Sequence, residues 1–226
     1  MRIRLVALIL CLLALPLASD LLAHGVAASD KDLITQGRQL AVFVYLGAKH
    51  MVTGYDHLLF LFGVIFFLYR LKEVAIYVTL FAVGHSITLL YAVLSGTHVN
   101  PFIIDAIIGL SVVYKALDNI GGFNRLLGFQ PNTKLAVWIF GLFHGLGLGT
   151  KLQDFSLSTE GLVPNILAFN VGVELGQVLG LSAILIAMGF WRRSAGFHRH
   201  AFAANVAVMT CGFILAGYQL VGYATQ

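Results

Sequence analysis

The sequence is poor in charged residues, which soluble domains need in order to stay in solution. Charged residues occupy only 11% of the 226 positions, whereas hydrophobic residues occupy 59%, and the mean hydropathy is +0.89. A water-soluble domain of this length would aggregate with such a composition, so the soluble globular class is excluded. We therefore expect an all-α, polytopic membrane helical bundle.

Cysteine is almost absent as well. The chain has two, Cys11 near its start and Cys211 in its last apolar segment, so a disulfide framework and a thiolate metal site are excluded. Any metal must be held by nitrogen and oxygen ligands. The formal net charge of +4 does not predict a nucleic-acid partner, because the cations lie in short connectors rather than on one face.

The first residues have the pattern of a secretory signal peptide. Arg2 and Arg4 precede an apolar run over residues 5–17, which is followed by small residues. The pattern predicts a signal peptide over residues 1–23, with His24 as the new amino terminus and residues 24–226 as one membrane domain. An uncut anchor and a different cleavage position stay open as alternatives.

Six apolar segments follow, each about as long as the roughly 20 residues that cross a bilayer. They cover approximately residues 40–69, 73–95, 101–118, 134–150, 163–190 and 200–222. The first is too long for one straight helix and contains Gly54, where we expect a break. Lysine and arginine are concentrated in alternate connectors, which predicts a multi-pass protein of the bacterial inner (plasma) membrane with its mature amino terminus outside.

Several ionisable side chains interrupt these apolar segments. An ionised group at membrane depth costs about 2.5 to 3.5 kcal/mol even on the lenient insertion scale, so such groups usually bind, relay or gate something. Counting residues along each span places most of them in one layer of the outer half or the middle of the membrane. The predicted metal ligands are His50, Asp56, His57, His85, His144 and Glu174, with Asn170, Gln177, Asp105 and Ser86 in support.

The spacing of His50 and His57 raises a geometric problem. They are seven positions apart, which on an unbroken helix is about 10 Å along the axis. This distance is too large for one metal bonded at about 2.1 Å to each ring. Either Gly54 unwinds the helix or the two histidines serve successive stations. Asp56 is then a metal ligand or the acceptor that fixes a histidine tautomer.

Each polar residue also has a purely structural interpretation. An isolated intramembrane histidine can simply bond a carbonyl oxygen, and the stripe of Asn170, Glu174 and Gln177 can hold helices together. Asp105 can be a near-surface acid at a helix start, and Ser86 can bond back to its own helix, as can Thr88. We expect the remaining mature-chain histidines to face water or headgroups; they are His24, His98, His198 and His200.

Two motifs carry a resemblance to a known family. The segment His50-Met-Val-Thr-Gly-Tyr-Asp56-His57 and the triplet Phe143-His144-Gly145 resemble the histidine motifs of the HupE/UreJ family of hydrogenase and urease accessory membrane proteins. Residues 84–89 and 169–177 are similar to the second branch of that family. The resemblance implies a nickel or cobalt permease that feeds metalloenzyme maturation, with His50, Asp56, His57 and His144 as its functional positions.

The sequence departs from the better-characterised branch after the second motif. That branch has an acid shortly after Phe-His-Gly, whereas Lys151 lies near that position here, and Glu174 is the candidate for the missing carboxylate. A cation at this place would repel a divalent ion.

The leading hypothesis is entry or capture of a divalent transition metal from the outer side. His50 and His57 would receive the ion while Asp56 balances charge, and an inner station would consist of His85, His144 and Glu174. Imidazole and carboxylate ligands suit nickel, zinc, copper or cobalt without choosing among them, and the resemblance implies nickel first. The expected partners are the metal ion, membrane lipid and a metalloenzyme maturation system.

Two other classes stay open. An intramembrane metal-dependent hydrolase would activate water on zinc, with a nearby carboxylate as proton acceptor. A non-transporting membrane metal-binding assembly partner would bind the ion without moving it. The leading hypothesis makes the protein a carrier and not an enzyme.

Overall fold

A computed structural model of the chain describes residues 37–153 and 160–226, and every regular element in these ranges is a helix. The prediction of an all-α fold is confirmed. The predicted signal peptide and His24 lie outside the described residues. The helices are α3 (Leu40–Thr53), α4 (Tyr55–Ile65), α5 (Leu71–Ser95), α6 (Pro101–Asn119), α7 (Gly122–Leu127), α8 (Thr133–Gln153), α9 (Leu162–Arg192) and α10 (Phe197–Ala224).

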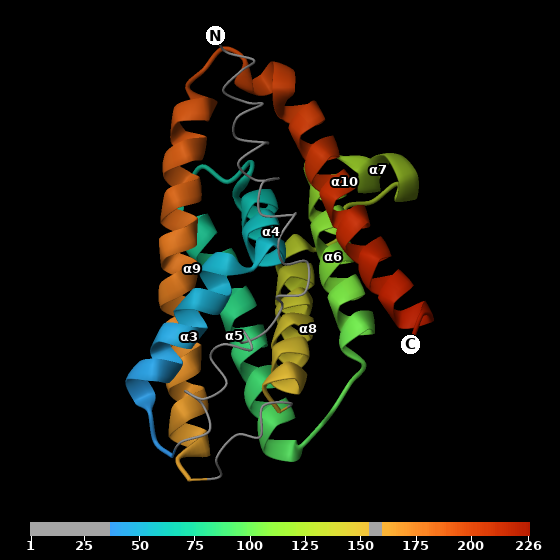
Figure 1. Ribbon diagram of the computed structural model, residues 1–226. Helices are drawn as coiled ribbons and strands as arrows, with labels where there is room; N and C mark the ends of the chain where they lie inside the picture. The colour runs from blue at the N-terminus through green and yellow to red at the C-terminus, as the bar shows by residue number, and fades with distance from the viewer. Residues whose placement is uncertain (1–36, 154–159) are drawn as a thin grey trace.

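The helices form an elongated bundle in which consecutive long helices alternate in direction (Figure 1). Helices α5, α6, α8, α9 and α10 run along the bundle, and α3 and α4 follow each other in the same direction. Helix α7 and the connectors before α5 and α10 lie toward the upper end in Figure 1, and they contain Arg125, Arg70 and Arg193, respectively. We call this end the basic end, and the other end the opposite end.

Four of the six predicted spans meet the length and composition of a membrane-crossing helix; they are α5, α8, α9 and α10. The predicted first span consists of two short apolar helices, α3 with 14 residues and α4 with 11. Helix α6 has 19 residues but carries Asp105, Lys115 and Asp118. These features make the chain a helical membrane protein, while the count of six crossings does not follow from the helices alone.

The bundle consists of three closely packed helix pairs, α3 with α9, α5 with α8, and α6 with α10. Glycine lies at each interface. A Cβ atom at Gly172 would overlap the carbonyl oxygen of Val44, one at Gly145 would overlap that of His85, and one at Gly109 would lie 2.7 Å from the backbone of α10. Since lipid gives helices no hydrophobic reason to associate, such close backbone approach is what holds membrane helices together.

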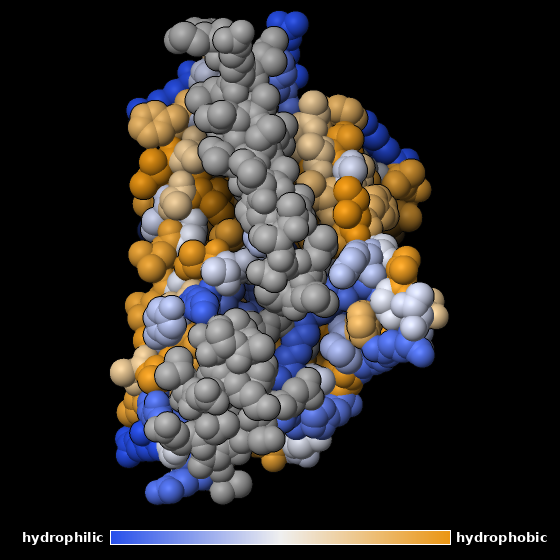
Figure 2. Space-filling view, viewed as in Figure 1, coloured by the Kyte–Doolittle hydropathy of each residue, from blue (hydrophilic) through white to orange (hydrophobic). Residues whose placement is uncertain are grey.

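The outer surface of the bundle carries many large apolar side chains. On the face in Figure 2, hydrophobic residues line the left flank and the upper right, and hydrophilic residues lie at the top, toward the bottom and at the lower right. Large side chains such as Leu179, Ile186 and Phe213 are more than half exposed, which only a lipid environment makes favourable. The surface therefore agrees with the membrane class.

Two asparagines fix helix starts near the opposite end of the bundle. The Oδ1 atom of Asn100 accepts hydrogen bonds from the backbone N–H groups of Phe102 and Ile103, at 3.0 and 3.3 Å, ahead of Pro101. Buried Asn165 of α9 accepts from the backbone of Gln39 and donates to the carbonyl of Gly37, both at 2.9 Å. The start of α3 is thereby held against α9.

Candidate metal centre

The break at Gly54 solves the spacing problem of the first motif. Gly54 has an extended backbone (φ −72°, ψ 107°) between α3 and α4, and the His50 and His57 rings come within 4.9 Å of each other, centroid to centroid. A Cβ at this position would lie 2.6 Å from Nδ1 of His57, so the site needs glycine here for space. Of the two alternatives for the spacing, the structure supports the unwound turn.

Four helices contribute to one buried cluster of potential metal ligands. His50 comes from α3, Asp56 and His57 from α4, His85 from α5 and His144 from α8, and each is at most 7% exposed. Two groups of three share His57: His50 with His57 and His85, and Asp56 with His57 and His144. Within each group the ligand atoms lie within 4.8 Å of one another, close enough for small shifts to bring them around one ion.

Hydrogen bonds fix the tautomers of two of the imidazoles. Nδ1 of His57 lies 3.0 Å from Oδ1 of Asp56, and Nδ1 of His144 lies 2.7 Å from the carbonyl oxygen of Phe140. Both oxygens only accept, so each neutral ring carries its proton on Nδ1 and presents its Nε2 lone pair. This is the carboxylate–histidine or carbonyl–histidine arrangement that orients metal ligands in proteins.

His85 is the most deeply placed member of the cluster. It has no exposed surface, and neither ring nitrogen has a hydrogen-bond partner among the described residues. Nε2 of His57 likewise has no such partner there. Buried polar atoms are nearly always satisfied, so these nitrogen atoms are available to a ligand or a water molecule.

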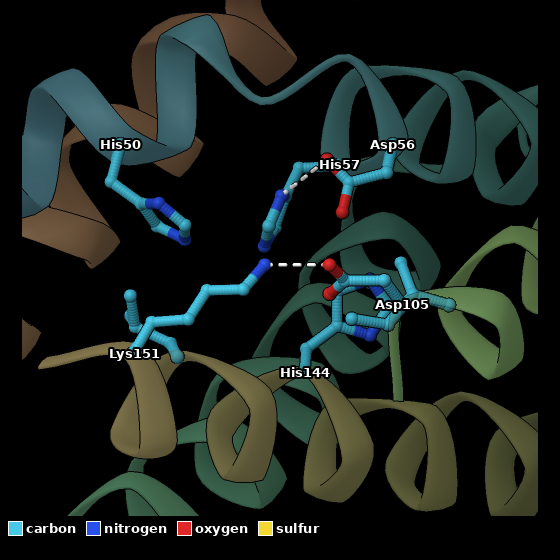
Figure 3. Close-up of a pocket in the computed structure, with 8 residues that line it drawn as sticks. His50, Asp56, His57, Asp105, His144 and Lys151 are labelled. Atoms are coloured by element: carbon cyan, nitrogen blue, oxygen red, sulfur yellow. Dashed lines mark hydrogen bonds and ion pairs between the residues drawn. The ribbon is translucent and has the colours of Figure 1, made fainter. Parts of the chain in front are cut away.

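Asp105 and Lys151 complete the pocket on the side of the opposite end (Figure 3). Lys151 reaches from the last turn of α8, and its Nζ donates to Oδ2 of Asp105 on α6 at 2.6 Å, beside the His57 ring. Asp105 is 7% exposed, so it faces the interior of the bundle near the start of α6. The cavity has a volume of about 10 Å³, and its lining consists of His50, Asp56, His57, Asp105, Ile108, His144, Leu148 and Lys151.

Three phenylalanines close the cluster on the side of the basic end. Phe60, Phe81 and Phe140 lie on α4, α5 and α8, each about one turn nearer the basic end than the histidine of its own helix. The Phe60 ring is 5.4 Å from that of Phe81 and 6.0 Å from that of Phe140, and Phe81 is 4.8 Å from the His144 ring. We call these three residues the aromatic floor. Sequence reasoning missed it, because phenylalanine in an apolar span gives no signal of its own.

The structure does not bring Glu174 into the cluster, which corrects the expectation of an inner station that includes its carboxylate. The glycines at 172 and 176 face α3, and this turns Glu174 to the exposed side of α9 together with Leu175. The carboxylate beside Lys151 is that of Asp105.

The other polar residues of α5 and α9 differ in their hydrogen bonds. Ser86 donates to Oδ1 of Asn170 at 3.2 Å, so it links α5 to α9 and does not bond to its own helix. Gln177 is 1% exposed, and the side-chain nitrogens of Gln177 and Asn170 have no hydrogen-bond partner among the described residues. Thr88 bonds both to its own helix and to the carbonyl of Leu142, at 2.6 Å.

The remaining described histidines lie where the sequence predicts. His98, His198 and His200 are exposed, near the ends of their helices. Their positions separate them clearly from the four buried imidazoles of the cluster.

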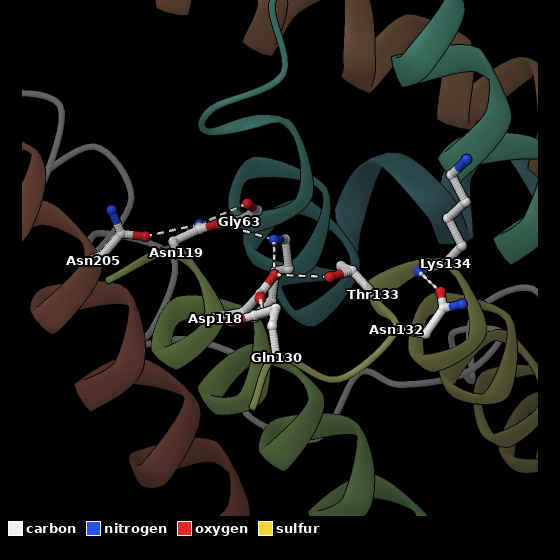
Figure 4. A network of polar contacts seen from close by, with 9 residues as sticks. Gly63, Asp118, Asn119, Gln130, Asn132, Thr133, Lys134 and Asn205 are labelled. Carbon is white, nitrogen blue, oxygen red and sulfur yellow. Dashed lines mark hydrogen bonds and ion pairs between the residues drawn. The ribbon is translucent and has the colours of Figure 1, made fainter. Parts of the chain in front are cut away.

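A second polar region lies near the basic end (Figure 4). Lys115 of α6 donates to Asp118 and, at 2.8 Å, to Asn119. Asn119 donates to the carbonyl of Gly63 at 2.8 Å and to the side chain of Asn205 on α10 at 2.9 Å. We call these five residues, together with Gln130 and Thr133, which contact Asp118, the basic-end network.

The fold and the cluster together define a class: a helical membrane protein with a buried histidine and carboxylate site. A family model described as HupE / UreJ protein matches residues 27–226. The chain therefore belongs to the HupE/UreJ family, as the two histidine motifs predicted. No curated protein and no solved structure matches the chain.

Proposed function

We propose that the protein is a permease of the bacterial inner membrane for a divalent transition metal, nickel first and cobalt, zinc or copper next. One observation carries the proposal: four imidazoles and a carboxylate from four helices lie below 8% exposure and form two groups of three, and within each group the ligand atoms lie within 4.8 Å of one another. Nitrogen and oxygen donors of this kind suit the later first-row metals, and affinity order alone does not choose among them.

The sharing of His57 supports transport over permanent binding. Because one imidazole nitrogen binds one ion, the two groups around His57 cannot both be filled, and an ion can pass from the group with Asp56 and His144 to the group with His50 and His85. Conduction needs several sites that bind weakly enough to release the ion. Two overlapping sets of three ligands meet that requirement.

The proposed topology has six crossings with the mature amino terminus outside. Helices α3 and α4 together make one crossing, and α6 makes another in which Asp105 and Lys115 are each paired. The basic end would face the cytoplasm, following the positive-inside tendency of membrane proteins. The cavity then lies on the extracytoplasmic side of the aromatic floor.

Family membership supports the biological setting. HupE/UreJ proteins belong to an accessory and transport family rather than an enzyme family, and the resemblance of the two motifs points to hydrogenase or urease maturation. We propose that the imported ion is delivered to such a system inside the cell. The cavity of about 10 Å³ has room for an ion or one water molecule, so it gives the hydrolase alternative no support.

A second candidate function is metal binding without transport, as an assembly partner. The aromatic floor favours it, because Phe60 and Phe81 are each 1% exposed and close the cluster toward the basic end. A permease must open this floor in its working cycle.

Flux measurements separate the two candidates. The full chain in proteoliposomes would be tested for uptake of Ni²⁺, Co²⁺, Zn²⁺ and Cu²⁺, with His57→Ala as the site variant and His198→Ala, on exposed α10 surface, as the control. We expect uptake by the wild-type and control proteins and none by His57→Ala. Tight binding without flux would instead make the protein an assembly partner, and equal uptake by all three proteins would contradict the site.

A further inference from the structure

The pocket contains its own cation, the ammonium group of Lys151. We propose that a divalent ion enters by displacing this ammonium, and that Asp105 thereby becomes the carboxylate ligand on the outer side of the site. The inference rests on the proposed metal-binding function and adds a mechanism of entry and a ligand to it.

The ammonium lies in the same pocket as the histidines that would bind an arriving ion. Nζ of Lys151 is 2.6 Å from Oδ2 of Asp105, and both residues line the same cavity as His50, His57 and His144. A cavity of about 10 Å³ holds roughly one water-sized particle. An ion that enters this space therefore lies directly beside the ammonium of Lys151.

The charges of the pocket favour exchange over coexistence. With neutral imidazoles, Asp56, Asp105 and Lys151 leave one net negative charge, so a divalent ion added beside the lysine would make the pocket positive. When the lysine leaves, the ion and the two carboxylates balance. Like charges a few ångströms apart in a poorly solvated site repel strongly, so the two cations compete for Asp105.

The position of Lys151 also allows its side chain to move out of the pocket. It lies in the last turn of α8, its side chain is 17% exposed, and among the described residues its side chain bonds only to Asp105. A flexible four-carbon stem lets an ammonium near a membrane boundary extend to the headgroups. Lys115 contrasts with it, because two side chains, Asp118 and Asn119, hold its ammonium.

Asp105 is the carboxylate that this exchange makes available. Asp56 already accepts a hydrogen bond from His57, which orients the ring. Asp105 makes no such contact with a histidine among the described residues, and its partner is the ammonium that departs. Displacement thus turns an ion pair between α6 and α8 into a metal ligand.

Equilibrium binding to the purified full chain tests the exchange, with Ni²⁺ and Zn²⁺ as the probes. Lys151→Met removes the competing charge and keeps the length of the side chain, so we expect the Kd to fall about tenfold or more. The double variant Lys151→Met/Asp105→Asn should bind at least about tenfold more weakly than Lys151→Met. Lys134→Met, at the exposed start of α8, is the matched control and should bind like the wild type.

A second measurement uses the wild-type chain and does not depend on a variant that folds. Acylation of lysine amines, quantified by mass spectrometry, should increase several-fold at Lys151 when Ni²⁺ saturates the site, while labelling of Lys134 stays constant. Two outcomes would show that the ion pair is only structural and that the inference is wrong. One is that Ni²⁺ binds but leaves the labelling of Lys151 unchanged or lower; the other is that Lys151→Met does not tighten binding. Absence of binding by the wild type would overturn the proposed function as well.

Discussion

The histidine cluster and the basic-end network are two buried polar regions of one bundle, and they differ in how their polar atoms are satisfied. In the network, Lys115, Asp118, Asn119 and Asn205 are all hydrogen-bonded to one another or to backbone. In the cluster, Nε2 of His57 and both ring nitrogens of His85 have no hydrogen-bond partner among the described residues. The polar side chains of the first region satisfy one another, whereas those of the second do not.

This difference separates structural from functional polarity inside a membrane protein. A satisfied network joins helices and stabilises their arrangement. An unsatisfied cluster costs free energy, which is tolerated when a ligand recovers it. Changes in the cluster should therefore alter metal affinity with little loss of stability, and changes in the network should do the reverse.

The largest expected effect is that of removing His57, because both groups of three ligands contain it. His57→Ala should weaken Ni²⁺ binding by more than the roughly 10- to 100-fold that loss of an outer-shell partner costs. The thermal midpoint of the metal-free protein should fall only slightly, since the loss of the hydrogen bond to Asp56 is partly offset by removal of an unsatisfied nitrogen. Calorimetric titration and thermal unfolding of the same samples check both statements. A large loss of stability with unchanged affinity would break the comparison.

A smaller effect is expected from Asp56→Asn, which keeps the shape of the side chain and removes its charge. The carboxylate accepts from Nδ1 of His57 at 3.0 Å and so directs Nε2 toward the pocket. We expect Ni²⁺ affinity to fall about 10- to 100-fold, as for other partners of metal-binding histidines. Asp118→Asn in the basic-end network is the matched control and should leave the affinity unchanged. Equal losses in both variants would mean that the two regions are coupled.

Glycine packing provides the next test, since it positions two histidines without contacting metal. A Cβ at Gly145 would overlap the carbonyl of His85 and the side chain of Thr88, so Gly145→Ala must separate α5 from α8. We expect a destabilisation of about 1 to 3 kcal/mol together with weaker metal binding. Gly217→Ala on α10, where a Cβ meets nothing within 4 Å, is the control and should be neutral or slightly stabilising. Thermal unfolding in detergent and metal titration give the two readouts.

Much of the fold could be predicted from the sequence, because membrane spans depend on local properties. Hydropathy and turn residues placed five helices within three residues of their observed ends; the predicted span 73–95, for example, is Leu71–Ser95. The break at Gly54 was also predicted, from the length of the first segment. Composition alone does not identify α6 as a span, because its charges are paired only in the folded bundle.

The sequence predicts which histidines belong to the site, but not how their side chains are arranged. The depth of each residue could be counted along its helix, which placed His50, His57 and His144 in one layer, and the structure brings them together. Which way each residue faces depends on how helices pair, and this is why Glu174 was misplaced: the glycines of α9 face α3 and turn the carboxylate outward. The role of Lys151 needed its partner Asp105, which is 46 residues away in the chain.

The smallest expected effect comes from the basic-end network. Asn205 of α10 accepts a hydrogen bond from Asn119 of α6 at 2.9 Å and donates one to the carbonyl of Ala201 in its own helix. Asn119 also donates to the carbonyl of Gly63, so it joins α6 to both α10 and α4. Asn205→Ala should lower the free energy of unfolding by only about 0.5 to 1.5 kcal/mol, the usual range for one interhelical hydrogen bond in a membrane. Metal affinity should remain that of the wild type, because the network lies on the far side of the aromatic floor. Titration of this variant with Ni²⁺ measures the affinity. A tenfold loss would show that changes at the basic end reach the cluster through the aromatic floor, and the two regions would then not be separate.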